Sequence, residues 1–228
     1  MNHFQSCGLQ IITVLSHPLE QNTYIAWLPG NSECVVIDPG LQPEKIVQHL
    51  EQRRLTPAAV LNTHGHVDHI GGNAALKTRW PECQIVIGAA EAAKLTDARQ
   101  NLSIAMGLSV ISPPADVSVN DGERYKAAGI DFQVLALPGH SPGHVVYRWD
   151  DQQSSVVFVG DVIFAGSVGR TDFADGNSRE LVAGIRSKLF TLPDATILLP
   201  GHGPATTVGD ERRTNPYVGD QVRRCRNL

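Results

Sequence analysis

Short runs of β-branched and aromatic residues alternate with helical patterns along this chain, and this alternation limits the possible folds more than any other feature. The first half carries the runs LQIITVL, NTYIAWL, ECVVIDPG, AAVLN and QIVIG, each closed by Gly, Pro or Asn, which predict strands. Apolar residues at helical spacing predict helices over Pro43–Arg54, from about Gly71 to Trp80, and over Ala90–Asp97. Strands and helices that alternate in this way are typical of layered α/β proteins.

The second half repeats the pattern. AAGIDFQVLAL predicts a hairpin, and HVVYRW, SSVVFVG and TILL predict further strands. A helix is predicted from about Ser178 to Thr191, with Ser178 as its N-cap. The segment from Ala98 to Ala115 has no period, and we interpret it as a mobile flap over the site described below. Two β-rich halves without a linker predict an α/β sandwich that forms a single domain over residues 1–228.

Composition and charge exclude several classes of protein. The chain has 228 residues and a formal net charge of −4, which is the wrong sign for binding nucleic acid. There is no basic and apolar leader and no apolar run long enough for a membrane span, so we expect no membrane association and a cytoplasmic location. Its 4 cysteines form no CxxC pair, which argues against a zinc knuckle or a redox motif. The pattern does not indicate an oligomeric state.

Residue types that ligate metals are crowded into the stretch NTHGHVDHIGG, directly after the predicted strand AAVLN. Three further predicted strands also end in such a residue. Loops at strand ends meet at one edge of a layered α/β protein, so we expect these side chains to converge on one centre. The candidates are His64, His66, Asp68, His69, His140, Asp161 and His202.

The spacing within the cluster favours two ions. His64 and His66 project to the same side of an extended chain and can share one ion. Asp68 and His69 lie further around the turn and can serve a second ion, about 3.5–4 Å away as in two-metal hydrolytic sites. Imidazole and carboxylate ligands suit Zn²⁺, Fe²⁺ or Mn²⁺, and the lack of a cysteine ligand favours a catalytic over a structural site. His144 is interpreted as a residue that only orients the loop of His140.

These residues resemble the metallo-β-lactamase superfamily, whose pattern is HxHxDH followed by a lone His, a lone Asp and a final His. From about Leu9 to Val218 the chain is similar more specifically to glyoxalase II (hydroxyacylglutathione hydrolase) of the short bacterial type. The matching segments are THGHVDHIGG, LPGHSPGHVVY, VGDVIFAGSVGRTDF and LLPGHGPATTVGDERRTNPYV. The resemblance implies a four-layer αβ/βα sandwich with the metals at one edge, between two sheets.

The resemblance also implies roles for the candidate residues. Two divalent metal ions are expected, with zinc preferred and iron or manganese as alternatives. Asp68 and Asp161 would also be the catalytic carboxylates, and Arg170 in the GRTDF loop would bind a substrate carboxylate unless it forms an ion pair with Asp172. The implied ligands are His64, His66 and His140 for the first ion, Asp68, His69 and His202 for the second, and Asp161 as the bridge.

The implied activity is hydrolysis of a small-molecule thioester, such as S-lactoylglutathione, by a metal-bound hydroxide to give a hydroxy acid and a thiol. Full-length glyoxalase II has a helical C-terminal domain that binds glutathione, and too few residues follow His202 for us to expect that domain here. Recognition of glutathione is therefore left open. Two alternatives remain: a persulfide dioxygenase with a single iron, whose loop typically has cysteine where this chain has Ser167, and another hydrolase of the same fold, such as a lactonase.

Overall fold

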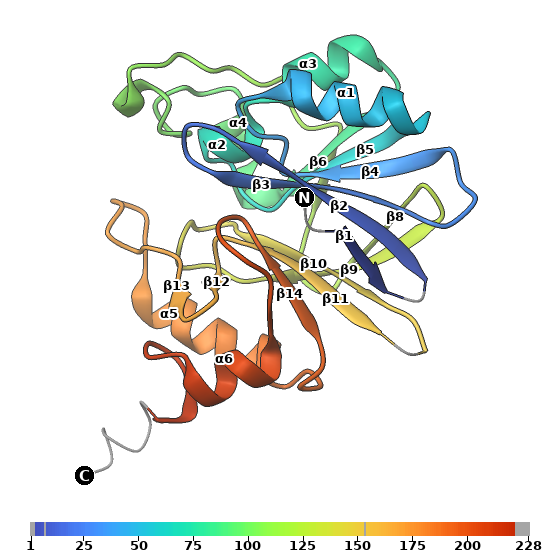
Figure 1. The fold of residues 1–228 in the computed structure, drawn as a ribbon. Coiled ribbons are helices and arrows are strands. Elements are labelled where there is room, and N and C mark those ends of the chain that lie inside the picture. The colour runs from blue at the N-terminus through green and yellow to red at the C-terminus, as the bar shows by residue number, and fades with distance from the viewer. Residues whose placement is uncertain (1–2, 7, 153, 222–228) are drawn as a thin grey trace.

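The computed structural model describes residues 3–6, 8–152 and 154–221 and arranges them in four layers, with two face-to-face sheets and helices on the outer face of each (Figure 1). The first sheet has 7 strands in the order of the chain. Strands β1 to β4 are antiparallel to their neighbours, and β4 to β7 run parallel. Its strands are β1 (His3–Ser6), β2 (Leu9–Ser16), β3 (Gln21–Trp27), β4 (Glu33–Ile37), β5 (Thr56–Asn62), β6 (Gln84–Gly88) and β7 (Val117–Val119).

Helices cover the outer face of this sheet. In α1 (Pro43–Arg53), Pro43 stands in the first turn, where its missing N–H costs nothing, and Ile46 and Leu50 are buried against the sheet. The helix predicted from about Gly71 to Trp80 is α3 (Asn73–Arg79), and a separate short helix that was not predicted, α2 (Val67–Ile70), precedes it. The other short helices of this half are η1 (Ala89–Glu91), α4 (Ala92–Leu95) and η2 (Ile104–Met106).

The second sheet has 6 strands in the order β15-β14-β11-β10-β9-β8. On its outer face lie α5 (Ser178–Gly184), which continues as the π-helical turn η3 (Ile185–Leu189), and α6 (Val208–Thr214). A two-stranded ribbon, β12 (Ile163–Phe164) and β13 (Ser167–Val168), follows β11. The strands of the sheet are β8 (Arg124–Ala127), β9 (Ile130–Ala136), β10 (Val145–Asp150), β11 (Ser155–Gly160), β14 (Ile197–Pro200) and β15 (Thr206–Thr207).

The predicted cap of α5 is wrong by one residue. Asn177, not Ser178, is the N-cap, and its side chain accepts hydrogen bonds from the backbone N–H groups of Arg179 and Glu180. An N-cap residue needs an extended backbone, and Asn177 has φ −147° and ψ 102°. Ser178 is already the first helical residue, so its side chain does not cap the helix.

The two sheets enclose the main apolar core. Tyr147, Phe132 and Phe158 are among its largest fully buried side chains, and Tyr24 packs edge-on against Phe158 with the ring centroids 5.5 Å apart. Such edge-to-face contacts are the favoured geometry of aromatic pairs. This architecture confirms the predicted four-layer sandwich. Within the described ranges, no helix has the length and apolar character needed to cross a membrane.

The two described cysteines, Cys34 and Cys83, are buried free thiols. Cys7 and Cys225 lie outside the described residues.

Candidate metal centre

All seven predicted ligands lie at the same edge of the sandwich, between the two sheets. The loops that carry them follow β5, β9, β11 and β14, one strand from the first sheet and three from the second. Their side-chain nitrogen and oxygen atoms form overlapping groups whose members all lie within 4.8 Å of one another. The groups are His64, His66 and His140; Asp68, His69 and His202; and His64, His69 and Asp161, which connects the other two.

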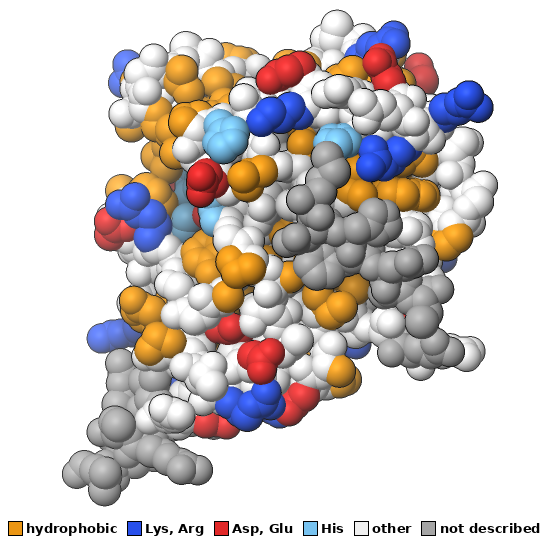
Figure 2. Space-filling model, viewed as in Figure 1, with side chains coloured by type: hydrophobic (Ala, Val, Ile, Leu, Met, Phe, Trp, Pro, Cys, Tyr) orange, Lys and Arg blue, Asp and Glu red, His pale blue; other side chains and the backbone are white. Residues whose placement is uncertain are grey.

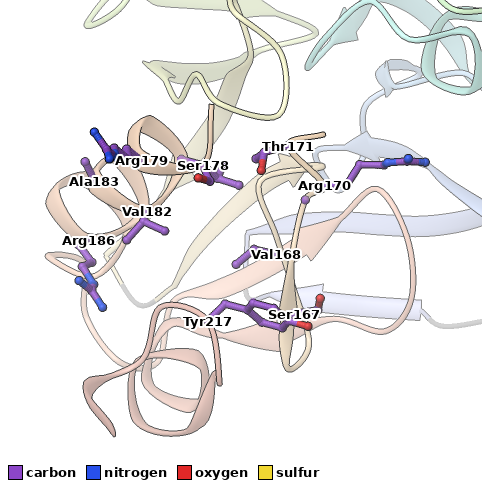
Figure 3. A pocket seen from close by; sticks show the side chains of 12 residues that line it. Ser167, Val168, Arg170, Thr171, Ser178, Arg179, Val182, Ala183, Arg186 and Tyr217 are labelled. Carbon is purple, nitrogen blue, oxygen red and sulfur yellow. The ribbon is translucent and has the colours of Figure 1, made fainter. Parts of the chain in front are cut away.

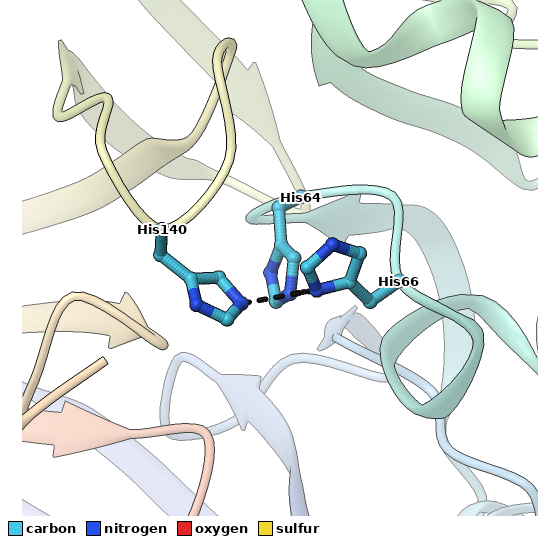
Figure 4. Close-up of side chains that lie close together, drawn as sticks. All are labelled: His64, His66 and His140. Atoms are coloured by element: carbon cyan, nitrogen blue, oxygen red, sulfur yellow. Dashed lines mark hydrogen bonds between the residues drawn. The ribbon is translucent and has the colours of Figure 1, made fainter. Parts of the chain in front are cut away.

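The first ligand group consists of the three histidines His64, His66 and His140 (Figure 4). The Nδ1 atom of His66 lies 3.0 Å from Nε2 of His64 and 3.0 Å from Nε2 of His140. All three side chains are buried. His66 occupies the N-cap position of α2, so the turn into this helix directs its ring toward the loop that follows β9.

Hydrogen bonds on the outer side of these rings leave lone pairs pointing inward. Nδ1 of His140 lies 2.8 Å from the carbonyl oxygen of Arg170, which can only accept, so the ring proton must be on this nitrogen. Nδ1 of His64 lies 3.1 Å from the Thr63 hydroxyl, which donates its own proton to Asp38. Both Nε2 atoms therefore present lone pairs to His66, which can donate to only one of them. A cation between the three nitrogens satisfies all of them.

The second ligand group consists of Asp68, His69 and His202. Oδ2 of Asp68 lies 3.2 Å from Nε2 of His202 and 3.7 Å from Nε2 of His69. Nδ1 of His69 is 3.0 Å from the Asp38 carboxylate, and Nδ1 of His202 is 3.1 Å from the carbonyl oxygen of Leu19. Each ring is thus held from outside, with its Nε2 atom facing the centre.

Asp161 lies between the two groups. Its Oδ1 is 3.4 Å from Nε2 of His69, and its Oδ2 is 3.6 Å from Nε2 of His202 and 3.7 Å from Nε2 of His140. Oδ1 of Asp161 and Nε2 of His69 are buried without a hydrogen-bond partner among the described residues. Buried polar atoms are rarely left without a partner, and two such atoms at the meeting point of the groups fit a pair of bound cations.

The two groups differ in electrostatics. Burial and the neighbouring histidines hold the pKa of His64 well below its usual value and lower the pKa of His66 to about 3. Burial also opposes protonation of His69, but the carboxylates of Asp161, Asp68 and Asp38 outweigh it and raise the pKa of His69 well above its usual value. His64 and His66 are therefore neutral imidazoles, whereas the second group is dominated by carboxylate charge.

Asp38 supports both groups and was not singled out by the sequence analysis. This buried carboxylate accepts hydrogen bonds from the backbone N–H of Thr63 at 2.7 Å and from the Thr63 hydroxyl at 2.8 Å, and it also binds His69. It follows β4 directly, in ECVVIDPG. The signal that identified the ligands, a polar residue at a strand end, could have identified Asp38 as well.

Glu91 is a second supporting residue that the sequence did not reveal. Its fully buried carboxylate accepts the backbone N–H of Gly65 and that of Gly143, each at 2.9 Å. It thereby ties the loop of His64 and His66 to the loop after β9, and Lys94 lies 3.4 Å from the same carboxylate. A glutamate in a short helix carries no pattern that could have predicted this role.

His144, predicted only to orient the loop of His140, contacts the loop of Asp161 and the ring of His64. Its buried ring stacks on His64 with the ring centroids 4.8 Å apart and the planes 19° apart. Its Nε2 accepts the backbone N–H of Asp161 at 3.2 Å. His144 belongs to none of the ligand groups.

A cavity of about 710 Å³ lies above the ligand groups, and histidine side chains show in a hollow on this face with hydrophobic side chains beside them (Figure 2). Arg170 lies at its edge, where it forms a bidentate ion pair with Asp172, with both N–O distances 2.7 Å, and its guanidinium lies 4.6 Å from the ring centroid of Phe173. Both roles predicted for Arg170 are thus open to it. Besides ligands and Arg170, the cavity is lined by Leu19, Val67, Leu102, Ala105, Met106, Phe164, Val168 and Phe173.

The segment from Ala98 to Ala115 forms part of this cavity wall. The carbonyl of Asn101 accepts the backbone N–H of Val67 at 2.9 Å, next to His66, and the side chains of Asn101 and Ser103 are buried. These contacts fix the base of the segment beside the ligand loop. The predicted mobility of its outer part stays a prediction.

A second cavity, of about 910 Å³, lies on the other side of the loop that carries Arg170 (Figure 3). Arg179 and Arg186 of the α5 region line it, whereas the side chain of Arg170 points away from them. No histidine, cysteine, aspartate or glutamate is among the described residues that line it, so it offers no metal ligands.

Comparisons with known proteins agree with this geometry. Residues 18–202 match the family model described as Metallo-beta-lactamase superfamily. The chain is 37% identical over 202 residues to the probable metallo-hydrolase YqgX of Bacillus subtilis, covering 88% of this chain and 93% of the relative. It is 35% identical over 217 residues to the hydroxyacylglutathione hydrolase GloC of Haemophilus influenzae, covering 94% of this chain and 99% of the relative.

Solved structures show the same similarity. The crystal structure of the B3 metallo-beta-lactamase BLEG-1 superposes with a TM-score of 0.86 at 34% identity, covering 91% of this chain and 99% of that one. TTHA1623, solved in a di-iron-bound form, superposes with a TM-score of 0.78 at 37% identity, covering 90% of this chain and 99% of that one.

Proposed function

The chain belongs to the metallo-beta-lactamase superfamily, and on that basis we propose that it is a binuclear metal-dependent thioesterase that hydrolyses S-lactoylglutathione or a related thioester. The observation that carries this proposal is the pair of adjoining ligand groups on the floor of an open cavity, connected by Asp161. A structural metal site is closed by its ligands, whereas a catalytic one faces the space where substrate binds.

Two comparisons support the choice of reaction and of metal number. The relative named hydroxyacylglutathione hydrolase is matched over 99% of its own length, which supports the same class of reaction for this chain. The relative solved in a di-iron-bound form supports two ions, and it leaves iron beside zinc as a candidate metal. The identity of the metal is decided by availability and geometry as much as by these ligands.

The residues have distinct tasks in the proposed reaction. The first group, the second group and Asp161 would hold the ions, which supply Lewis acidity and lower the pKa of water from 15.7 to about 7. The carboxylate of Asp68 faces the cavity with its pKa below the usual range, because His69 and His202 outweigh the opposing effect of burial. An ionised carboxylate there can accept a hydrogen bond from water and orient it for attack. The leaving thiol, with a pKa near 8.5, departs as a thiolate without a strong acid.

Arg170 and Phe173 would position the substrate. The guanidinium can bind a carboxylate of the thiol half through two hydrogen bonds, in place of Asp172. Phe173 lies edge-on to His66, with ring centroids 5.1 Å apart, and so forms a wall directly beside the first group. The apolar lining around them limits the entry of bulk water.

The test is thiol release from S-lactoylglutathione by metal-replete protein, followed with a thiol reagent and repeated after chelation and after metal is restored. We expect turnover that chelation abolishes and metal restores. No release from S-lactoylglutathione or from the other thioesters of a substrate series, by folded protein that contains two ions per chain, would contradict the proposal. Oxygen uptake with a persulfide by the iron-loaded protein, without thiol release, would support the dioxygenase alternative instead.

A further inference from the structure

The walls of the cavity above the ligand groups are apolar on nearly every side. This lining indicates that the site distinguishes thioesters by their acyl group more than by their thiol. We propose that the site prefers thioesters whose acyl group is a linear apolar chain, which lies in the cavity against Leu19 and Phe164 beside His202 and against Met106 of η2. This inference rests on the proposed thioesterase function and names its substrate class.

Two apolar side chains flank His202. The carbonyl of Leu19 is held by Nδ1 of His202 at 3.1 Å, and the Phe164 ring centroid lies 6.1 Å from that of His202. Leu19 keeps 37% of its surface exposed, and Phe164 is half-buried. Because both line the cavity, their free surface is available to an apolar group bound above the second ligand group.

The 3-10 helix η2 adds apolar surface to the same cavity. Met106 lines it and is 41% exposed. The flexible side chain of methionine adapts to ligands of different length. Leu102 and Ala105, close to Met106 in the chain, line the same cavity. Apolar surface left open beside a cavity is typical of a binding site for apolar ligands.

The opposite side of the cavity offers little to an anionic thiol. Phe173 and Arg170 lie there, with the Phe173 ring centroid 5.7 Å from that of His140. Arg170 is the one cation among the described lining residues, and Asp172 already neutralises it through two contacts of 2.7 Å. An anionic substrate must displace this carboxylate, so the net gain is small. We therefore expect the apolar side chains of Leu19, Phe164 and Met106, here called the apolar arm of the cavity, to decide which thioesters react faster.

The volume of the cavity agrees with a long acyl group. At about 710 Å³ it lies within the range of sites that enclose ligands much larger than a three-carbon acyl group. Each methylene buried against such walls contributes about 0.8 kcal/mol, which is about fourfold in kcat/KM.

The test uses zinc-loaded protein and a series of glutathione thioesters from acetyl to octanoyl. We expect kcat/KM to rise about fourfold per methylene until the wall is covered. The same acyl series on uncharged N-acetylcysteamine should show the same slope. Met106→Ser should lower the octanoyl-to-acetyl ratio of kcat/KM about tenfold. Ile104→Ser changes a residue of η2 that is 50% exposed and does not line the cavity, and it should leave the ratio unchanged.

The outcomes separate this inference from the proposed function. Thioesters that are all hydrolysed with kcat/KM independent of chain length would overturn the inference and leave the thioesterase standing. Absence of hydrolysis at every chain length would overturn the thioesterase. Binding of S-methyl- and S-octylglutathione, measured by calorimetry on the zinc-loaded protein, then tests the cavity itself: tighter binding of the octyl compound supports the apolar arm, and equal dissociation constants overturn it.

Discussion

The two ligand groups adjoin each other but differ in ligand type and in exposure to solvent. His64, His66 and His140 form a group of three histidines with 0%, 5% and 2% of their surface exposed. The second group contains a carboxylate and faces the cavity, with 15% of the Asp68 side chain and 28% of the His202 side chain exposed. The packed interior of the fold holds the side chains of a buried ligand group in place, whereas the side chains of an exposed group are held mainly by the loop that carries them. We therefore expect the first group to hold its ion more tightly and the second to exchange more readily.

The hydrogen bonds that hold the ligand loops also differ between the two groups. Glu91 joins two loops of the first group from within the interior. The loop of His202 is held from the start of β3, where Asn22 Nδ2 and the Tyr24 hydroxyl both donate to the carbonyl of Pro200, at 3.1 and 2.7 Å. The variants below test whether damage to one group or its support leaves the other group intact.

The largest effect is expected from Asp161→Asn, which removes the charge shared by both groups while keeping the shape of the side chain. Loss of a supporting partner alone costs about 10–100-fold, so we expect kcat/KM to fall by more than about 100-fold. Metal analysis should show both ions weakened. Asp131→Asn, at an exposed carboxylate paired with Arg124, is the matched control. Unchanged metal content in Asp161→Asn would rule out its bridging position.

His66→Ala and His202→Ala separate the two groups. Each removes one of three ligands of one group, so metal content should fall from two ions to about one in either variant. We expect the greater loss in His66→Ala, more than about 100-fold in kcat/KM, against about 10–100-fold for the open group. Spectra of the cobalt-substituted proteins report which group remains filled. If both variants lost both ions, the groups would not be independent.

Glu91→Gln should weaken the first group alone. A glutamine has only one acceptor oxygen for the two backbone N–H groups, so we expect a cost of about 1–3 kcal/mol in the free energy of unfolding of the metal-free protein. Affinity for the first ion should fall about 10–100-fold, measured by competition with a chelator. Glu44→Gln, exposed on α1, is the control. An equal loss at both groups would show that Glu91 supports the whole fold and no particular site.

Tyr24→Phe should give the smallest effect, confined to the second group. Its hydroxyl shares the Pro200 carbonyl with Asn22, so its loss costs about 0.5–1.5 kcal/mol of unfolding free energy. Tyr125→Phe removes a similar hydrogen bond, to Gln84 at 2.8 Å, far from the ligands in the fold. We expect both variants to lose similar stability, measured by urea unfolding. Only Tyr24→Phe should release the second ion more readily, and identical metal affinity in the two would contradict the assigned support.

The elements of the fold could be predicted because their signals are local. The period of apolar residues located α1, β2 to β6 and β9 to β11 to within a few residues. The short helix α2, which begins within the HxHxDH stretch, was not predicted, and the cap of α5 lies one residue earlier than predicted. Helix ends depend on backbone angles that a composition pattern does not specify.

The sequence by itself determined the chemistry of the candidate ligands, because imidazole and carboxylate groups at the ends of strands are properties of residue type and local pattern. Only the tertiary structure decided which atoms meet. Nε2 of His140 reaches Nδ1 of His66 across 74 residues of chain, and Glu91 binds Gly143 across 52. Such contacts follow from how the two sheets pack and leave no periodic trace in the sequence. The same holds for the cavity wall, where Leu19 comes from the turn between β2 and β3, Met106 from η2 and Phe164 from β12.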